Sequence, residues 1–362
     1  GMLQGAFVLT SESSAVGPAF KFGERRSDAD DLTTAIKPRL ESARPSEEEM
    51  EAMRERWMRA REVRNAVAGM AREEGAAVLL QVSSRDHGVI RGGGDSAGRN
   101  ADAGNPLPQV VLPPEQYNSI WRNVKAGVPV ELEMDVRNRF FDDDLQAYNT
   151  IGEIPGTDLA DEVVMIGAHL DSWHYGQGAA DNAAGSVVMM EALRILQELG
   201  LQPRRTVMIG LWSGEEQGLL GSRGWVENHP EMHDRISAYL NYDNGTGKIR
   251  GIWTQSNEKV IPIFEQILWP FRDLGVVAVR HGDTGGTDHL AFDAAGIPGF
   301  NFIQDPIEYG IISHHTELDT FDHLLIDDLM QSAVVVAATV YHLAMRDEMV
   351  PRKPEEVVSD GS

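Results

Sequence analysis

The stretch VVMIGAHLD, residues 163–171, joins a short apolar run to polar residues that follow it directly. Apolar runs of this length are typical of strands that are buried on both faces of a sheet. Two later runs, Thr206–Trp212 and Ile236–Tyr242, have the same character, and a helix is predicted between the first two, at Ala183–Leu199 before Gly200. Strands that alternate with helices in this way indicate an α/β fold.

The rest of the chain extends this pattern in two parts. In the second half we predict helices at 257–274 and 327–345 and strands at 276–279 and 299–303. The first third predicts a smaller α/β unit, with helices that open at Ser46 and Pro114 and strands at 6–9, 76–82, 110–112 and 128–136. The acidic stretch 140–144 marks a boundary, which gives a first domain over 2–140, a second over 141–350 and a tail over 351–362.

Composition excludes several classes of protein. The 362 residues are 42% hydrophobic, as in globular proteins, and carry a formal net charge of −24. This acidic excess would repel nucleic acids and anionic membranes. The absence of cysteine excludes disulfides and thiolate metal sites. The longest apolar stretch, Ala333–Tyr341, falls short of the roughly 20 residues of a spanning helix. No signal peptide is visible, and Gly1 resembles the remnant of a removed tag.

Five residues that can bind a metal ion recur through the second half. They are His169 in GAHLDSW, Asp181 in GAADNAAG, Glu216 in WSGEEQG, Asp243 in NYDNGTG and His315 in SHHTELDT. Most of them follow a predicted strand end, where the loops of open α/β sheets form ligand sites. Two imidazoles and three carboxylates are the ligands that two zinc ions need if one carboxylate bridges them. The pattern therefore predicts two Zn²⁺ per chain.

Two further residues suit roles beside the metal ions. Glu215 is adjacent to Glu216, and the repulsion between the two carboxylates requires a nearby cation. With Glu216 on a metal ion, Glu215 would be the general base for a water whose pKa zinc lowers to roughly 7. Asp171 follows His169 by two residues, and its carboxylate is expected to accept from the second ring nitrogen and fix the tautomer.

Each of these residues also has a simpler interpretation when it is considered alone. Asp181 precedes a helix and suits an N-cap, and Asp243 suits an Asx-turn. His174, in DSWHYGQ, could line a substrate pocket or face solvent. Asp288 and His289, in GGTDHLAF, are expected to cap the helix that follows them. The order of the five ligands, and their place at strand ends, argues against all of them being incidental.

Together, GAHLDS, ADNAAG, EEQGLLGS, the NYD segment and SHHTELDT resemble the motifs of the M28 family of co-catalytic zinc aminopeptidases and carboxypeptidases. HLDSWxxGQGAxD, LWSGEEQG and the doubled histidine before Thr316 are most similar to the plasma glutamate carboxypeptidase branch, a group of dipeptidases. The resemblance covers residues 149–320. It implies a mixed central sheet flanked by helices, the fold of zinc-dependent exopeptidases, and the hydrolysis of dipeptides or short peptides.

The resemblance also assigns the metal ligands. It implies that His169 and Asp243 bind one zinc ion, that Glu216 and His315 bind the other, and that Asp181 bridges the two. In this assignment all five residues are used.

Other expectations follow from the same resemblance. Glu215 would be the general base, and His314 occupies the position from which relatives stabilise the oxyanion. The first third is similar to the protease-associated domain that several members insert into the peptidase domain. Relatives suggest a homodimer and an extracytoplasmic or secreted location. Since such relatives carry a peptidase segment ahead of the insertion, we expect the first domain to be truncated at its start.

Two other functions remain as alternatives. A catalytically silent binding or receptor-like protein on the same fold would usually have lost metal ligands, whereas this chain retains all five together with Glu215. A single-zinc acyltransferase of the glutaminyl cyclase type fits less well, because the paired set of ligands and the inserted domain are those of the peptidases.

Overall fold

A computed structural model of the chain describes residues 1–17, 26–27, 47–92, 107–139, 141 and 143–354. The chain divides into two compact units. Unit 1 comprises Gly1–Phe22, Ala43–Leu145 and His315–Leu318, and unit 2 comprises Gly23–Ser42, Gln146–His314 and Asp319–Ser362. The predicted helix start at Ser46 and most of the predicted tail lie outside the described residues. The three-part division at 140 and 350 stays a prediction.

Unit 2 is built on a seven-stranded mixed sheet in the order β4-β6-β5-β7-β10-β8-β9. Its strands are β4 (Thr150–Ile154), β5 (Leu159–His169), β6 (Arg205–Trp212), β7 (Ile236–Asn241), β8 (Ile249–Trp253), β9 (Ala278–Arg280) and β10 (Gly299–Gln304). Strands β6, β5, β7 and β10 are parallel, while β4 is antiparallel to β6 and β8 is antiparallel to β10. The predicted α/β fold with a mixed central sheet is confirmed.

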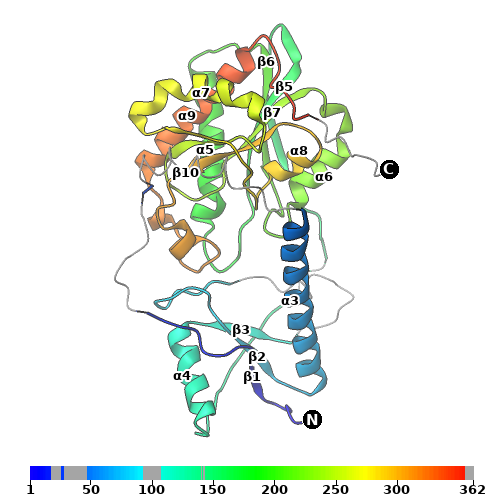
Figure 1. Cartoon of the computed structure of the whole chain (residues 1–362), viewed down its shortest axis with the longest axis vertical. Coiled ribbons are helices and arrows are strands. Elements are labelled where there is room, and N and C mark those ends of the chain that lie inside the picture. The colour runs from blue at the N-terminus through cyan, green and yellow to red at the C-terminus, as the bar shows by residue number, and fades with distance from the viewer. Residues whose placement is uncertain (18–25, 28–46, 93–106, 140, 142, 355–362) are drawn as a thin grey trace. The chain divides into compact units, whose positions relative to one another are not determined.

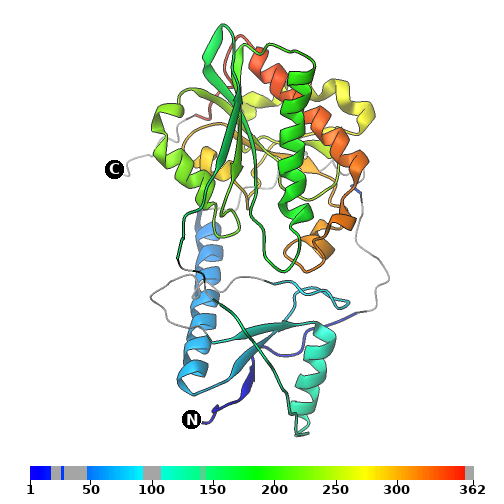
Figure 2. The ribbon, with the colours of Figure 1, turned by 180° about the vertical axis from the view of Figure 1, so that it is seen from behind.

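Helices cover both faces of this sheet (Figures 1 and 2). One face carries α5 (Ala184–Glu198), α7 (Ile261–Leu268) and α9 (Ile326–Met345), and the other carries α6 (Leu220–Asn228) and α8 (His289–Ala294). Strand β5 contributes side chains to both faces. Val164 and Ile166 pack in the hydrophobic core under α5, α7 and α9, whereas Val163 and Met165 pack in the core under α6 and α8. Alternate side chains of a strand point to opposite faces, so a strand that is apolar at every position needs cover on both.

Helix α9 has a second possible interpretation from its composition. Among the described residues it is the one helix long and apolar enough to cross a membrane, by length and composition alone. However, 56% of its apolar window is buried inside the protein. Val335, Val336 and Val340 belong to the core that α5 shares, so packing against the sheet accounts for the apolar sequence.

Two predictions in unit 2 were incomplete. The predicted helix at 257–274 is three consecutive pieces, Glu258–Val260, α7 and Trp269–Leu274. Pro262 and Pro270 lack an amide hydrogen, so each suits the first turn of a new piece rather than a helix interior. Strands β4 and β8 were not predicted, because each is short and has a central glycine that weakens the strand signal. At Gly251 of β8 a side chain would clash with the main chain of Ala278 on β9.

Single turns complete the helical elements of unit 2. They are Ala179–Ala183, Pro230–Met232, Tyr309–Ser313 and Phe321–His323.

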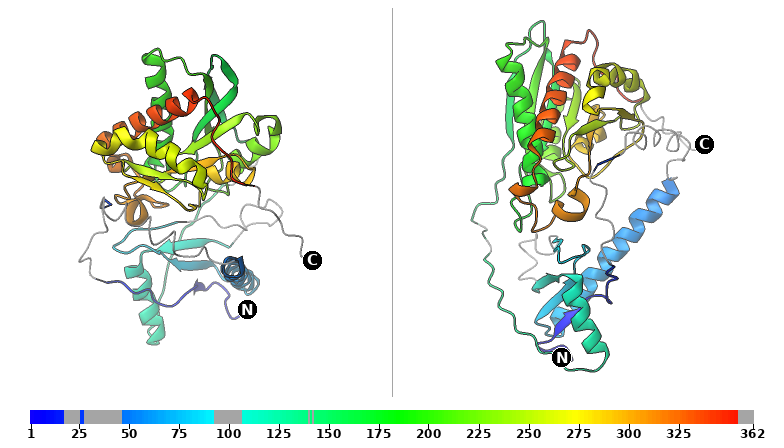
Figure 3. Two further views of the ribbon diagram at one scale, coloured as in Figure 1. Left: turned by 45° about the horizontal axis from the view of Figure 1, so that its top comes forward. Right: turned by 90° about the vertical axis from the view of Figure 1, so that its left-hand side faces the viewer.

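Unit 1 contains a parallel three-stranded sheet between two helices (Figure 3). Its elements are β1 (Phe7–Leu9), α3 (Glu47–Glu73), β2 (Val78–Val82), β3 (Gln109–Leu112) and α4 (Pro114–Lys125). Leu79 packs against Ala71 of α3 on one face, and Leu80 packs against Tyr117 of α4 on the other. The predicted strand at 128–136 is wrong. Those residues pair with no strand among the described residues, and only Leu132 and Met134 of the alternating set pack on the core.

Candidate metal centre

Strand register brings distant segments of unit 2 to one edge of the sheet. His169, the last residue of β5, is paired with Trp212, the last residue of β6. Gly167 of β5 is paired with Asn241, the last residue of β7. Because these three strands are parallel, the residues that follow them emerge at the same edge. The Glu215–Glu216 turn follows β6, and Asp243 follows β7.

His169, Asp181 and Asp243 form a buried group whose ligand atoms all lie within 4.8 Å of one another. His169 Nε2 is 3.4 Å from Asp181 Oδ1 and 3.5 Å from Asp243 Oδ1. Two ligands of a tetrahedral zinc ion, each about 2.1 Å from the metal, stand about 3.4 Å apart. The spacing of this group therefore suits a zinc ion bound between the three side chains.

The electrostatics of this group indicate that it requires a cation. His169 Nε2 and Asp243 Oδ1 are buried and have no hydrogen-bond partner among the described residues. Burial alone would lower the pKa of His169, but Asp243, Asp171 and Asp181 raise it well above its usual value. Burial would raise the pKa of Asp243, and the charge of His169 lowers it instead. A divalent cation would supply this positive charge and leave the imidazole neutral, as a ligand must be.

Asp171 links His169 to the turn that follows β6. His169 Nδ1 lies 2.9 Å from the main-chain oxygen of Asp171 and 3.6 Å from its carboxylate Oδ1. The ring nitrogen therefore donates to the main chain, not to the carboxylate as we predicted. The carboxylate instead accepts from the amides of Glu215 (3.0 Å) and Glu216 (3.2 Å). Although burial opposes it, the His169 ring, together with these amides, lowers the pKa of Asp171.

Asp319 holds the loop that carries Asp181, and it is a residue that our sequence analysis did not single out. Its carboxylate accepts from the amide of Ala180 (2.6 Å) and from that of Asp181 (3.1 Å). Burial raises the pKa of Asp319 to about 6. The available signal was its place four residues after His315, inside the SHHTELDT motif.

The motif ADNAAG also has a structural role beyond Asp181. The Asn182 side chain donates to the main-chain oxygen of Tyr242 (2.9 Å) and accepts from the amide of Gly185 (3.1 Å). Any side chain at Gly185 would clash with Tyr242 and Asn182. The start of α5 is thereby fastened to the residue before Asp243.

Glu215 is buried beside this group, whereas Glu216 is half-buried. Burial, followed by the charge of Asp243, raises the pKa of Glu215 to about 9. A cation bound nearby would favour the ionised carboxylate and lower that pKa. Glu216, which we predicted to bind a metal ion, is not in this group of closely spaced ligand atoms.

His314 and His315 follow the turn Tyr309–Ser313. The ring of His314 lies against Tyr309, with centroids 4.8 Å apart. Arg91 Nη2 lies 3.2 Å from His315 Nδ1. A guanidinium can only donate, so Nδ1 is the acceptor in this contact and the ring hydrogen is on Nε2. His315 could bind zinc only after this contact is lost, so this histidine is less ready for a metal ion than His169.

Three other predicted residues are not among these candidate ligands. His174 is exposed. Asp288 and His289 do lie at the start of α8, but the side chain of Asp288 makes no capping hydrogen bond, so the predicted cap is wrong. Asp288 instead accepts from Ser222 Oγ at 2.5 Å.

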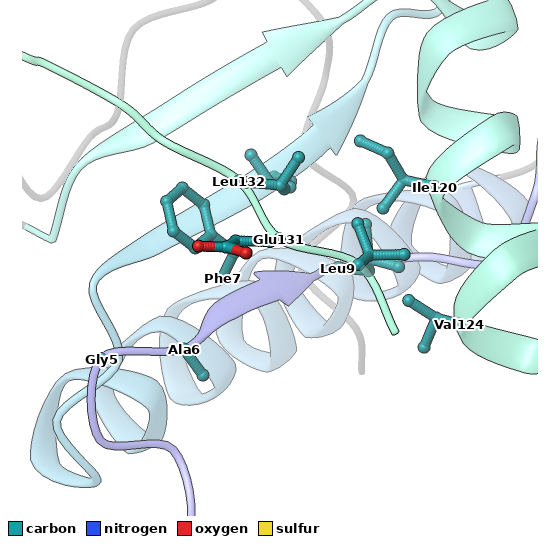
Figure 4. A pocket seen from close by; sticks show the side chains of 10 residues that line it. Gly5, Ala6, Phe7, Leu9, Ile120, Val124, Glu131 and Leu132 are labelled. Atoms are coloured by element: carbon teal, nitrogen blue, oxygen red, sulfur yellow. The ribbon is translucent and has the colours of Figure 1, made fainter. Parts of the chain in front are cut away.

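Unit 1 contains an apolar cavity of about 520 Å³ that has a different character (Figure 4). Its lining includes Phe7, Leu9, Ile120, Val124, Leu132 and the carboxylate of Glu131. A single carboxylate among apolar side chains provides neither a metal-ligand set nor an acid–base pair. We therefore place the functional site at the strand ends of unit 2.

A mixed α/β sheet with candidate histidine and carboxylate ligands at its parallel strand ends is the arrangement that the motifs predicted for a zinc peptidase. The comparisons agree, because the profile of peptidase family M28 matches residues 149–340. The chain belongs to this family, as the motifs predicted.

Relatives of known sequence specify the branch. Carboxypeptidase Q of Homo sapiens is 30% identical over 247 residues, which are 68% of this chain and 52% of that protein. Leupeptin-inactivating enzyme 1 of Streptomyces exfoliatus is 36% identical over 154 residues, which are 42% of this chain and 34% of the relative. The predicted likeness to the plasma glutamate carboxypeptidase branch is confirmed. The chain spans about half the length of the carboxypeptidase Q sequences that it matches.

Solved structures share the fold. A peptidase M28 precursor from Shewanella amazonensis superposes with a TM-score of 0.66 at 28% identity, over 80% of this chain and 65% of that one. A zinc aminopeptidase from Bacillus subtilis has a TM-score of 0.54 at 21% identity, over 77% and 67%. The likeness of unit 1 to a protease-associated domain stays a prediction.

Proposed function

We propose that this chain is a metallo-exopeptidase that uses two zinc ions to hydrolyse dipeptides or short peptides. The observation that carries the proposal is the buried group His169, Asp181 and Asp243, whose geometry and charge suit a zinc ion next to Glu215. The names of relatives support it, since they include a carboxypeptidase and a zinc aminopeptidase. Those two names differ in the end of the peptide that is attacked.

The residues of the site would divide the work. His169, Asp181 and Asp243 would hold the first ion, and His315 and Glu216 would join Asp181 at the second. Zinc supplies Lewis-acid chemistry, which lowers the pKa of water and polarises a carbonyl group. The Glu215 carboxylate would take the proton of the attacking water and pass it to the leaving amine. His314 would donate to the oxygen on which negative charge develops.

We further propose that the two ions bind with unequal affinity. In the group His169, Asp181 and Asp243, the imidazole nitrogen already stands at zinc-ligand spacing from both carboxylates. Among the residues proposed for the second ion, His315 must first give up its contact with Arg91. The first ion should therefore bind more tightly.

The test is a zinc titration of metal-free protein, followed by elemental analysis and a peptide screen. We expect two zinc ions per chain in two resolved steps, with hydrolysis of free dipeptides after loading. The screen should include peptides that are acetylated at the amino end and peptides that are amidated at the carboxyl end. Loss of cleavage with one of these modifications identifies the end that the site holds. Two bound ions with no cleavage of any peptide would favour the silent binding protein, and no bound zinc would refute the site.

A further inference from the structure

Asp288 is a buried carboxyl group that the proposed chemistry does not use. It is 0% exposed, and its Oδ1 accepts a short hydrogen bond from Ser222 Oγ, which is also 0% exposed. Its other oxygen, Oδ2, has no hydrogen-bond partner among the described residues. A buried carboxyl with one unsatisfied oxygen is costly, so its retention calls for a functional explanation.

The partner of Asp288 lies on the helix that continues from Glu215. The amides of Gly218 and Leu219 donate to the main-chain oxygen of Glu215, and Ser222 is in the first turn of α6. Asn149 holds the same turn by donating to the main-chain oxygen of Gly221. The Asp288–Ser222 bond therefore fastens the helix start on which the orientation of Glu215 depends.

The residue beside Asp288 contacts the strand end that leads to the metal group. Thr287 is buried, and its hydroxyl accepts from Asn241 Nδ2 at 2.9 Å. Asn241 is the last residue of β7, two residues before Asp243. Two adjacent residues thus contact two segments of the site, Thr287 the end of β7 and Asp288 the helix that continues from Glu215.

We propose that Thr287 and Asp288 are a positioning pair, which holds Glu215 at a fixed place relative to the metal group through Ser222 and Asn241. This inference rests on the proposed function for its effect on catalysis. Its structural part concerns only the order of the turn at 214–222.

The test compares Ser222→Ala, Asp288→Ala and Asp288→Asn with Ser237→Ala. Ser237 is a similarly buried serine at the start of β7 whose hydroxyl accepts from the amide of Val350, so it is a control for the loss of a buried hydroxyl away from the site. Zinc content, kcat, KM and hydrogen exchange of residues 214–222 are measured for each variant and for the double variant Ser222→Ala with Asp288→Ala.

We expect Ser222→Ala and Asp288→Ala to lower kcat roughly tenfold to a hundredfold, with KM within about twofold and zinc content unchanged. The rate of amide hydrogen exchange of residues 214–222 should increase in both variants. Asp288→Asn keeps an acceptor for Ser222 and should recover most of kcat. The double variant should be no worse than either single variant, because both break one bond.

The inference is overturned if exchange at 214–222 stays as in the unaltered protein, or if Ser237→Ala lowers kcat equally. Absence of peptide hydrolysis in the zinc-loaded, unaltered chain would refute the proposed function instead. In that case the exchange measurement still decides the positioning role. Should Asp288→Ala fail to fold, Ser222→Ala and Asp288→Asn decide the question.

Discussion

Units 1 and 2 both place parallel strands between helices, but their strand ends differ. Strand β2 of unit 1 is followed by Ser83, whose hydroxyl donates to the main-chain oxygen of Val89 and accepts from the amides of Arg85 and Arg91. Strand β5 of unit 2 ends at His169, whose Nε2 is buried next to two carboxylates and has no hydrogen-bond partner in the described part of the chain. In both units the parallel strands bring their carboxyl ends to the same edge of the sheet. We place the candidate ligand site in unit 2, because at this edge a buried imidazole and two carboxylates lie at the spacing of zinc ligands.

The largest effect on this difference is expected from Asp181→Asn. The substitution removes a charge from the buried group and from the proposed bridge between the two ions, so zinc affinity should fall by at least about 100-fold and peptide hydrolysis should reach background. Equilibrium dialysis with zinc and a dipeptide assay measure the two losses. Asp158→Asn, which alters an exposed carboxylate of unit 2, is the control and should change neither. Normal zinc binding by the Asp181 variant would contradict the proposed centre.

Glu215→Gln separates chemistry from metal binding. The amide has nearly the same shape but cannot take a proton, so kcat should fall by about 10² to 10⁴ while zinc content stays the same. Steady-state kinetics and elemental analysis of one preparation measure both quantities. Full activity would remove Glu215 from the role of general base.

Asp319→Asn probes the support of the metal group rather than its ligands. The asparagine side chain has one acceptor oxygen where the carboxylate has two, so one of the amides of Ala180 and Asp181 loses its partner. Zinc affinity or activity should fall by about 10- to 100-fold, as for other residues that orient metal ligands. An unchanged zinc titration together with unchanged kcat would show that the Asp181 loop holds its place without Asp319.

Asp288→Asn should alter the pH dependence of stability. Burial raises the pKa of Asp288 to about 7, whereas an aspartate in the unfolded chain titrates near 3.9. The folded state then keeps a proton that the unfolded state releases, so the stability of the unaltered protein falls as pH rises from about 4 to 7. Asparagine has no such proton. From pH 5 to 7 the variant should gain roughly 2–3 kcal/mol relative to the unaltered protein, at about 1.4 kcal/mol for each pKa unit.

Urea denaturation of the metal-free protein at pH 5, 6 and 7 measures this difference. Parallel curves for the two proteins would mean that Asp288 ionises normally in the folded state.

The smallest effect on the metal site is expected from Leu80→Ala in unit 1. Leu80 is 1% exposed and lines the apolar cavity, so its truncation should destabilise unit 1 by about 2–4 kcal/mol. Zinc affinity should stay within about twofold at temperatures where unit 1 remains folded. Calorimetry and the zinc titration are measured together. A loss of zinc that matches the loss in Asp181→Asn would end the functional contrast between the two units.

Local pattern was sufficient to predict much of the fold and the candidate ligands. The apolar runs of β5, β6 and β7 are long enough to be recognised as strands in the sequence. The polar residues that follow each run can be identified there as well. The pattern failed where local signals conflict with packing. The glycine at the centre of β4 and of β8 weakened the sequence signal of two strands that do form. The alternation at 128–136 predicted a strand, but those residues pair with no strand that the structure describes.

What the sequence by itself determined is the family, the α/β class and the candidate residues His169, Asp181, Asp243 and Glu215, because motifs and periodicity are properties of consecutive residues. Only the tertiary structure decided which of them meet, that the Asp171 carboxylate accepts from the Glu215 turn, and that Asp319 contacts the Asp181 loop and Asp288 contacts Ser222. These contacts join residues far apart in the chain. Hydrogen-bond partners and burial depend on strand register, and register is settled by the packing of the whole sheet.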